Sequence, residues 1–143
     1  MSKKLEYVKH QKKILAIILK KNFKKKGISF FTPNEFSQQL GYMSHDKNHE
    51  IQPHYHKKIK REIFFTQETL IIKKGKLRVD FYSKSKKYLK SRFVSSGDIL
   101  LLVSGGHGFK TLSKTEMIEI KQGPYWSDKD KIQFKKKKIK VKK

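Results

Sequence analysis

The residues best suited to chemistry in this chain are three histidines and one glutamate. His54 and His56 are separated by a single residue, Glu68 follows them, and His107 stands in a glycine-rich turn. Imidazole and carboxylate groups are common ligands of divalent metals in proteins. Residues two apart on a β-strand point to the same face, so we expect His54 and His56 to point into one cavity. The pattern therefore predicts a metal site inside a β-fold.

This set of ligands suits Zn²⁺, Mn²⁺, Fe²⁺, Ni²⁺ or Co²⁺, and the residue types do not select among these ions. In six-coordinate geometry, four protein ligands leave positions open for water or substrate, which distinguishes a catalytic metal site from a structural one. Each histidine also needs an acceptor for its second ring nitrogen. Glu50 and Gln52 share the strand parity of the two histidines and are candidates to line the cavity.

Three further side chains could take part in proton transfer. Glu62 or His49 could act as a general base, and Tyr125, which follows a Gly-Pro pair, could act as an acid. The alternative interpretation is structural, with Glu62 forming an ion pair with Arg61 in a loop and Tyr125 serving in packing. No Ser-His-Asp arrangement can be argued from the sequence.

The elements that must position these residues are short β-strands. From Ile28 onward, apolar or alternating segments are separated by turn signals at intervals of roughly 8–12 residues. The strands expected from the sequence cover residues 28–31, 50–56, 64–73, 76–82, 88–94, 99–103, 109–112 and 116–121. Residues 99–103 are apolar throughout, which predicts a strand buried on both faces. Such spacing is typical of a β-sandwich or barrel.

The two ends of the chain differ from this pattern. In residues 1–27, Leu5, Val8, Leu15 and Leu19 fall roughly at helical spacing among lysines, which predicts a basic amphipathic helix that ends near Gly27. It could be a surface-binding arm or an extension packed on the domain. Residues 135–143 are almost all lysine, and mutual repulsion is expected to keep this tail disordered.

Composition limits the classes of function. The formal net charge is +24, from 36 basic and 12 acidic residues, so an anionic partner is expected. All but three of the basic residues are lysines, whereas arginine is the preferred reader of phosphate and bases, and this argues against nucleic acid as the main partner. The chain has no cysteine and no apolar run long enough to span a membrane, and the short apolar run near its start lacks a cleavage site. These features favour a cytoplasmic protein.

Two stretches resemble the motifs of the cupin family. The first is Gln52-Pro53-His54-Tyr55-His56 with Glu68, which six residues separate from Gly75, and the second runs from Gly97 to His107. The resemblance covers about residues 29–134 and extends to a small group of bacterial single-domain cupins. Two departures from the family pattern stand out. Eleven residues separate His56 from Glu68 and must loop out, and Val103 replaces the usual proline of the second motif.

The resemblance implies one cupin domain over residues 28–134, an antiparallel jelly-roll β-barrel with a divalent metal held by His54, His56, Glu68 and His107. It also implies a homodimer and a small anionic substrate or ligand, with sugar-nucleotide or surface-polysaccharide metabolism as the expected context. Isomerase, epimerase and oxygenase chemistry all stay open. Two alternatives remain: a non-catalytic ligand-binding or sensor cupin on the same barrel, and a basic nucleic-acid-binding protein that uses its lysine-rich ends.

Overall fold

A computed structural model describes residues 3–143, except for the side chain of Asp128. The described chain contains ten β-strands, all paired antiparallel, and one 3-10 turn at Ser127–Lys129. The prediction of an all-β protein is therefore confirmed, while the jelly-roll order of strands stays a prediction. By its internal contacts the chain divides into two units. One unit comprises the residues up to Phe23 together with Thr66–Lys143, and the other comprises Lys24–Phe65.

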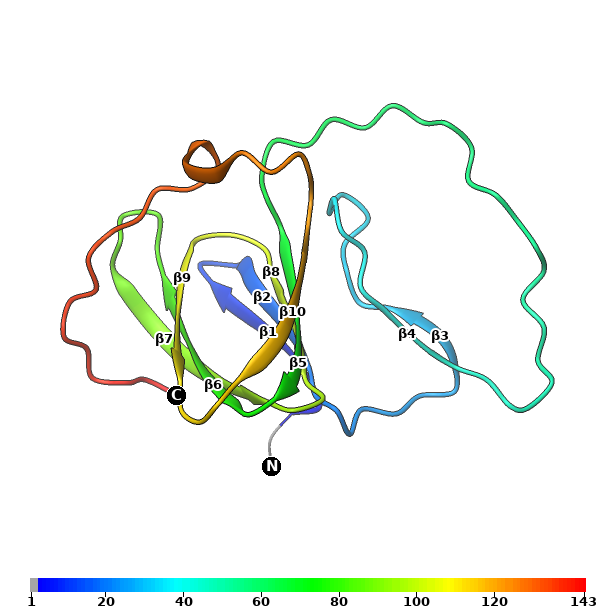
Figure 1. Cartoon of the computed structure of the whole chain (residues 1–143), viewed down its shortest axis with the longest axis horizontal. Coiled ribbons are helices and arrows are strands. Elements are labelled where there is room, and N and C mark those ends of the chain that lie inside the picture. The colour runs from blue at the N-terminus through cyan, green and yellow to red at the C-terminus, as the bar shows by residue number, and fades with distance from the viewer. Residues whose placement is uncertain (1–2) are drawn as a thin grey trace. The chain divides into compact units, whose positions relative to one another are not determined.

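The larger unit contains two sheets (Figure 1). The five-stranded sheet has the order β1-β2-β8-β5-β10, and the three-stranded sheet has the order β7-β6-β9. The strands of the first are β1 (Leu5–His10), β2 (Lys13–Leu19), β8 (Ile99–Leu102), β5 (Glu68–Lys74) and β10 (Glu116–Lys121). Those of the second are β7 (Tyr88–Ser95), β6 (Lys76–Tyr82) and β9 (Gly106–Thr111). Strands β9 and β10 are consecutive in the chain but belong to different sheets, and each is an edge strand.

The core lies between these two sheets. The five-stranded sheet contributes Val8, Leu15, Ala16, Ile18, Leu70, Ile72, Leu100 and Leu102, and the three-stranded sheet contributes Leu77, Val79, Phe81 and Val94. In β6 the apolar residues alternate with polar ones, so one face of the strand enters the core, as the sequence predicts. In β8, Leu100, Leu101 and Leu102 are all buried, which agrees with a strand buried on both faces.

The predicted N-terminal helix is wrong, because this segment forms the β1–β2 hairpin. Gln11 and Lys12 both have positive φ angles, 49° and 67°, which is the backbone of the two-residue hairpin turn whose twist matches paired strands. Strand β2 then pairs with β8 in the middle of the sheet. Residues 14–19 are a continuous apolar run, and the gain from burying such a run on both faces of a sheet outweighs a weak helical spacing.

The hairpin is tied to the rest of the unit by Asp98, which lies in the turn before β8. Its buried carboxylate accepts hydrogen bonds from the backbone N–H groups of Lys21 and Ser95, at 2.9 and 2.8 Å. Lys20 Nζ lies 3.2 Å from the same carboxylate. A charge-assisted bond to backbone N–H groups is stronger than a neutral one, so the end of β2 is held firmly to the β7–β8 turn.

The smaller unit contains one hairpin of β3 (Gly27–Phe30) and β4 (Gly41–Ser44). Strand β3 confirms the predicted opening strand. Thr32 Oγ1 donates to Gln39 Oε1 at 2.6 Å and accepts the N–H of Leu40, and these bonds close the loop between the strands. Residues 45–65 contain no strand and every one of them is exposed. The predicted strand over residues 50–56 is therefore wrong for this structure: Pro53 removes a donor at its centre, and no strand within the unit pairs with it.

The C-terminal tail has no helix or strand over residues 131–143, but it differs from the disordered tail expected. Its carbonyl at Lys142 accepts the N–H of Ser91 at 2.6 Å, and the N–H of Lys142 donates to the hydroxyl of Tyr88 at 2.7 Å. The ring of Phe134 meets the ring of Tyr82 edge-on, at 5.2 Å between centroids. The tail therefore packs on the outer face of β6 and β7, because apolar residues interrupt its lysines.

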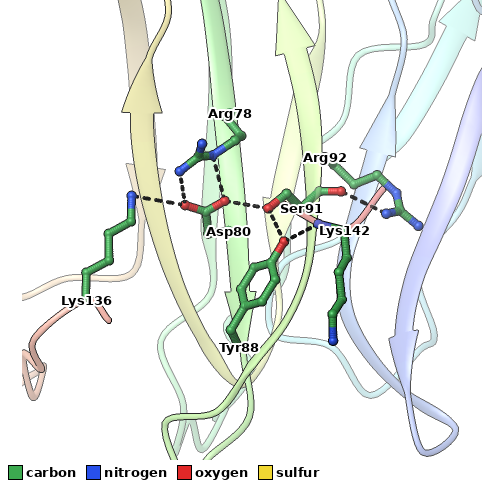
Figure 2. A network of polar contacts seen from close by, with 7 residues as sticks. All are labelled: Arg78, Asp80, Tyr88, Ser91, Arg92, Lys136 and Lys142. Atoms are coloured by element: carbon green, nitrogen blue, oxygen red, sulfur yellow. Dashed lines mark hydrogen bonds and ion pairs between the residues drawn. The ribbon is translucent and has the colours of Figure 1, made fainter. Parts of the chain in front are cut away.

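Beneath this tail lies a network of polar side chains centred on Asp80 (Figure 2). Arg78 Nε and Nη2 donate to the two carboxylate oxygens of Asp80, each at 2.9 Å. Ser91 also donates to this carboxylate, and Lys136 Nζ approaches it to 3.6 Å. Asp80 is 1% exposed. Burial raises the pKa of Asp80, but the hydrogen bonds from Arg78 and Ser91 together with the charges of Arg78 and Lys136 outweigh it, so that the pKa is lowered and the group stays ionised.

No helix in the described part of the chain is long and apolar enough to cross a bilayer.

Candidate functional site

Glu68 and His107 face each other from opposite sheets of the larger unit. Glu68 is the first residue of β5, two positions before the core residue Leu70, so both side chains point to the inner face of the five-stranded sheet. His107 lies in β9 directly opposite the core residue Phe81 of β6, which places it on the inner face of the three-stranded sheet. Two residues that are 39 positions apart in the chain therefore meet above the apolar core.

Their contact is close and partly shielded from solvent. His107 Nε2 lies 3.4 Å from Glu68 Oε2, and the two side chains are 30% and 20% exposed. A hydrogen bond from His107 lowers the pKa of Glu68; burial opposes this effect, and the charges of His107, Lys121 and Lys131 add to it. The net pKa is below the ordinary value of 4.5, so Glu68 is a carboxylate at neutral pH.

Lysine residues surround this pair. Strand β10 places Lys121 directly opposite Glu68, and Lys121 Nζ lies 3.2 Å from Glu119 Oε1. The same ammonium lies 5.4 Å from the centre of the Tyr125 ring. A carboxylate and an imidazole bordered by lysine and an aromatic ring can bind a cation between the first two groups. The lysines can then attract an anion to that cation.

The glycine-rich turn before His107 is shaped by the neighbouring strand. Gly105 has a φ angle of +74°, and a Cβ atom there would lie 2.8 Å from the carbonyl oxygen of Tyr82. Only glycine combines this backbone with such a close approach. The turn therefore brings β9 against the end of β6, and this pairing orients His107 toward the inner face.

His54 and His56 belong to the smaller unit. Their rings meet edge-on with centroids 5.4 Å apart, and both side chains are exposed. His54 Nδ1 is 2.8 Å from the carbonyl oxygen of Gln52. In the tautomer that donates this hydrogen bond, Nε2 of His54 carries the free lone pair that a metal ion would use. The structure thus brings the four expected ligands together as two pairs, one in each unit.

The three candidates for proton transfer are all exposed. Glu62 pairs with Lys60, at 3.6 Å from Oε1 to Nζ, instead of with Arg61. The ring of His49 stacks on that of His45, with 4.1 Å between centroids. Both lie in the smaller unit. Tyr125 is 78% exposed and lies in the larger unit, where its ring contacts Lys121, the residue that pairs with Glu68 across β10 and β5.

Among residues 3–143, no group of three or more His, Cys, Asp or Glu side chains is arranged to hold a metal ion. Comparison of the chain with models of protein families, with curated proteins and with solved structures finds no match. The resemblance to cupins therefore rests on the residues of the sequence alone.

Two groups of residues near the candidate site and the tail were not predicted from the sequence, although one of them carries a signal there. Lys121 and Lys131 affect Glu68 only through the pairing of β10 with β5 and the path of the chain after it. Nothing in the linear order signals this proximity. Arg78 and Asp80 are different, because opposite charges two residues apart on a predicted strand must lie on the same face. That spacing was a usable signal for the buried ion pair.

Proposed function

We propose that this protein binds a divalent metal ion at Glu68 and His107 and uses it to hold a small anionic metabolite at the inner face of its sheets. The observation that carries the proposal is the 3.4 Å contact between a carboxylate and an imidazole that come from opposite sheets. Facing strands hold both groups on a rigid scaffold, which is what a precise binding site requires.

The chemistry of the two groups supports a metal ion. Glu68 is ionised at neutral pH because its pKa is lowered, and a neutral imidazole offers a lone pair. With only these two protein donors, several coordination positions stay open for water, further ligands or a bound metabolite. The metal would supply Lewis acidity to that bound molecule, and the protein would position it.

The surrounding charge supports an anionic ligand. Lys121 and Lys131 both act on Glu68, and the whole chain carries a net charge of +24. A ligand bearing phosphate or carboxylate groups can bind the metal with one oxygen and the lysines with others. The cupin resemblance favours a sugar nucleotide. The same site without turnover would be a ligand sensor.

Metal analysis tests the first step. Protein purified without chelator is dialysed against Zn²⁺ or Mn²⁺ and its metal content is measured, for the wild type and for Glu68→Ala and His107→Ala. We expect the wild type to retain metal and both variants to lose it. His10→Ala is the matched control, since it removes a histidine from the β1–β2 hairpin. Wild-type protein without bound metal, or equal retention in all four proteins, would overturn the proposal.

Ligand binding tests the second step. UDP-glucose and glucose serve as anionic and neutral probes, measured by calorimetry with and without the metal. The proposal expects UDP-glucose to bind only in the presence of metal and glucose to bind far more weakly. Formation of a product separates an enzyme from a sensor. Equal affinity for the two probes would contradict the anionic site.

A further inference from the structure

The lysine-rich tail crosses the outer face of β6 and β7 and is fixed near both of its ends. Near its start, the ring of Phe134 packs edge-on against that of Tyr82. Near its end, the N–H of Lys142 donates to the hydroxyl of Tyr88 at 2.7 Å (Figure 2). The residues between these two contacts, 135–141, are therefore held beside the β6–β7 hairpin.

A cavity of about 750 Å³ lies between this part of the tail and the hairpin loop that joins β6 to β7. We call it the tail cavity. Its volume is in the range of small-molecule binding sites. Three aromatic residues contribute to its lining: Tyr82, Tyr88 and Phe134. Five lysines line it as well, two from the hairpin loop and three from the tail: Lys86, Lys87, Lys135, Lys137 and Lys138.

The tail cavity is separate from the candidate metal site. Tyr82 follows the core residue Phe81 on β6, and successive side chains of a strand point to opposite faces, so Tyr82 faces outward. His107 lies opposite Phe81 and therefore faces inward. A molecule in the tail cavity and a metal ion at Glu68 and His107 would occupy opposite faces of the three-stranded sheet.

The lysines of the tail cavity have no acidic partners. Among the described residues that line the cavity, none is Asp or Glu, and the five ammonium groups form no ion pair within the described part of the chain. The carboxylate beneath the tail, Asp80, is 1% exposed and already binds Arg78 and Lys136. Like charges that are held close together repel each other. An anion in the cavity would replace this repulsion with attraction.

The aromatic lining indicates which kind of anion fits. Phe134 and Tyr88 are only partly buried, so their rings can contact a ligand, whereas Tyr82 is buried behind them. The ring of Phe134 is firmly seated, since a Cβ atom at Gly106 would lie 3.1 Å from it. Nucleobases stack on such rings whatever their sequence, and lysines bind phosphate oxygens as point charges. A single phosphate offers fewer acceptor oxygens than five ammonium groups can use, so several phosphates fit better.

We propose that the tail cavity binds a nucleoside triphosphate. The base packs against Tyr88 and Phe134, and the phosphates lie among the five lysines. The tail then forms one wall of a binding site, which explains why a segment of such high charge is held on the surface of the sheet. This site requires no divalent metal, so it is independent of the function proposed for Glu68 and His107.

Calorimetry with three probes tests the recognition of both parts of the ligand. ATP, adenosine and tripolyphosphate are titrated into the full chain at about 150 mM salt, where long-range attraction to the net positive charge is screened. EDTA is present, so that no divalent metal can contribute. We expect one ATP per chain, and affinities about tenfold or more lower for adenosine and for tripolyphosphate. No binding of ATP, or equal affinity for tripolyphosphate, would overturn the proposal.

The use of EDTA also separates this inference from the proposed function. If ATP bound only after a divalent metal was added, the ligand would belong to the metal site and the tail cavity would not be its binding site. Binding of ATP in EDTA, by a protein that retains no metal after dialysis, would support the tail cavity while the proposed function failed.

Two triple variants of equal charge test the location of the site. The cavity variant carries Lys135→Gln, Lys137→Gln and Lys138→Gln. The control variant loses the same charge at the β5–β6 turn, at the opposite end of β6, through Lys73→Gln, Lys74→Gln and Lys114→Gln. All six lysines are exposed, so both variants should fold. We expect the cavity variant to lose about tenfold or more in affinity for ATP and the control to stay nearly unchanged. Equal losses would show that only the net charge attracts ATP.

A ring variant tests stacking of the base. Phe134→Leu keeps an apolar side chain but removes the aromatic face. ATP should then bind about tenfold more weakly, while tripolyphosphate should bind as it does to the wild type. Equal losses for both probes would contradict contact with the base. Competition with a short single-stranded oligothymidylate covers the remaining alternative: if it displaced ATP at a concentration far below that of ATP, nucleic acid would be the ligand and the proposal would be wrong.

Discussion

Glu68 and His107 come from different sheets, yet His107 Nε2 lies 3.4 Å from Glu68 Oε2 at the inner face of the larger unit. Each polar residue has an apolar core residue beside it: Leu70 lies two positions after Glu68 on β5, and Phe81 of the neighbouring strand β6 lies opposite His107. The pair therefore lies at the edge of the apolar core. Its position on two strands ties the site to the stability of both sheets.

Ionisation of Glu68 should contribute to stability in a pH-dependent way. Its pKa in the folded protein is lower than the ordinary value of 4.5, so its contribution is complete above pH 4.5 and is lost as the pH falls through the folded pKa. We expect the stability difference between the wild type and Glu68→Gln to shrink as the pH falls below 4.5. Urea unfolding at several pH values measures it. His107→Gln removes the main cause of the lowered pKa of Glu68. If Glu68→Gln changed the free energy of unfolding with the same pH dependence in the His107→Gln variant, His107 would not be the cause of the lowered pKa.

Loss of the Asp80 carboxylate should destabilise the protein strongly. Asp80→Ala removes a buried acceptor from Arg78 and Ser91, and breaking a buried ion pair in this way costs about 3–5 kcal/mol. Lys136→Ala is the control. Its side chain is 50% exposed and its ammonium lies 3.6 Å from the carboxylate, too far for a strong hydrogen bond, so its loss should cost about 0–1 kcal/mol. Midpoints of urea unfolding compare the two. Equal effects would show that the network is not held mainly by Arg78 and Ser91.

The N-terminal hairpin should be essential for folding. Ile18 is 1% exposed in the core, and Ile18→Ala should cost about 2–5 kcal/mol through lost burial and the cavity left behind. Ile132→Ala, at a position 83% exposed, should change stability by less than about 0.5 kcal/mol. Thermal unfolding followed by circular dichroism distinguishes them. If Ile18→Ala behaved like the control, residues 1–23 would be an accessory extension after all.

Gly75 should resist replacement by alanine. Its φ angle is +88°, and a Cβ atom would lie 2.2 Å from the carbonyl oxygen of Lys114, so the β5–β6 turn would have to shift. Backbone strain of this kind costs about 1–3 kcal/mol, and the clash adds to it. At Gly108 the nearest atom would be 3.8 Å away, so Gly108→Ala should be tolerated. Chemical denaturation measures the stability of both variants and of the wild type. If Gly75→Ala were as stable as Gly108→Ala, the backbone of the β5–β6 turn would not require glycine at position 75.

Much of the fold could be predicted from local patterns. The alternation of apolar and polar residues in 76–82 and the apolar run at 99–103 correctly predict β6 and β8. Both patterns are local, because the side chains of a strand alternate between its two faces with a period of two residues. The N-terminal segment misleads such reasoning, since its leucines and valine also fit a helical spacing. Its hairpin turn at Gln11 and Lys12 carries neither Gly nor Asn, so the usual signal is missing.

The candidate site was also predicted only in part from the sequence. Residue types and spacing alone selected Glu68 and His107, and they also selected His54 and His56. Only the tertiary structure brings Glu68 and His107 together, because β5 and β9 belong to different sheets and pair with strands that are remote from them in the chain. The positions of Lys121 and of the Asp80 network were decided there as well. Local sequence determines which face of a strand is apolar, whereas contacts between sheets depend on long-range pairing that no short window of residues contains.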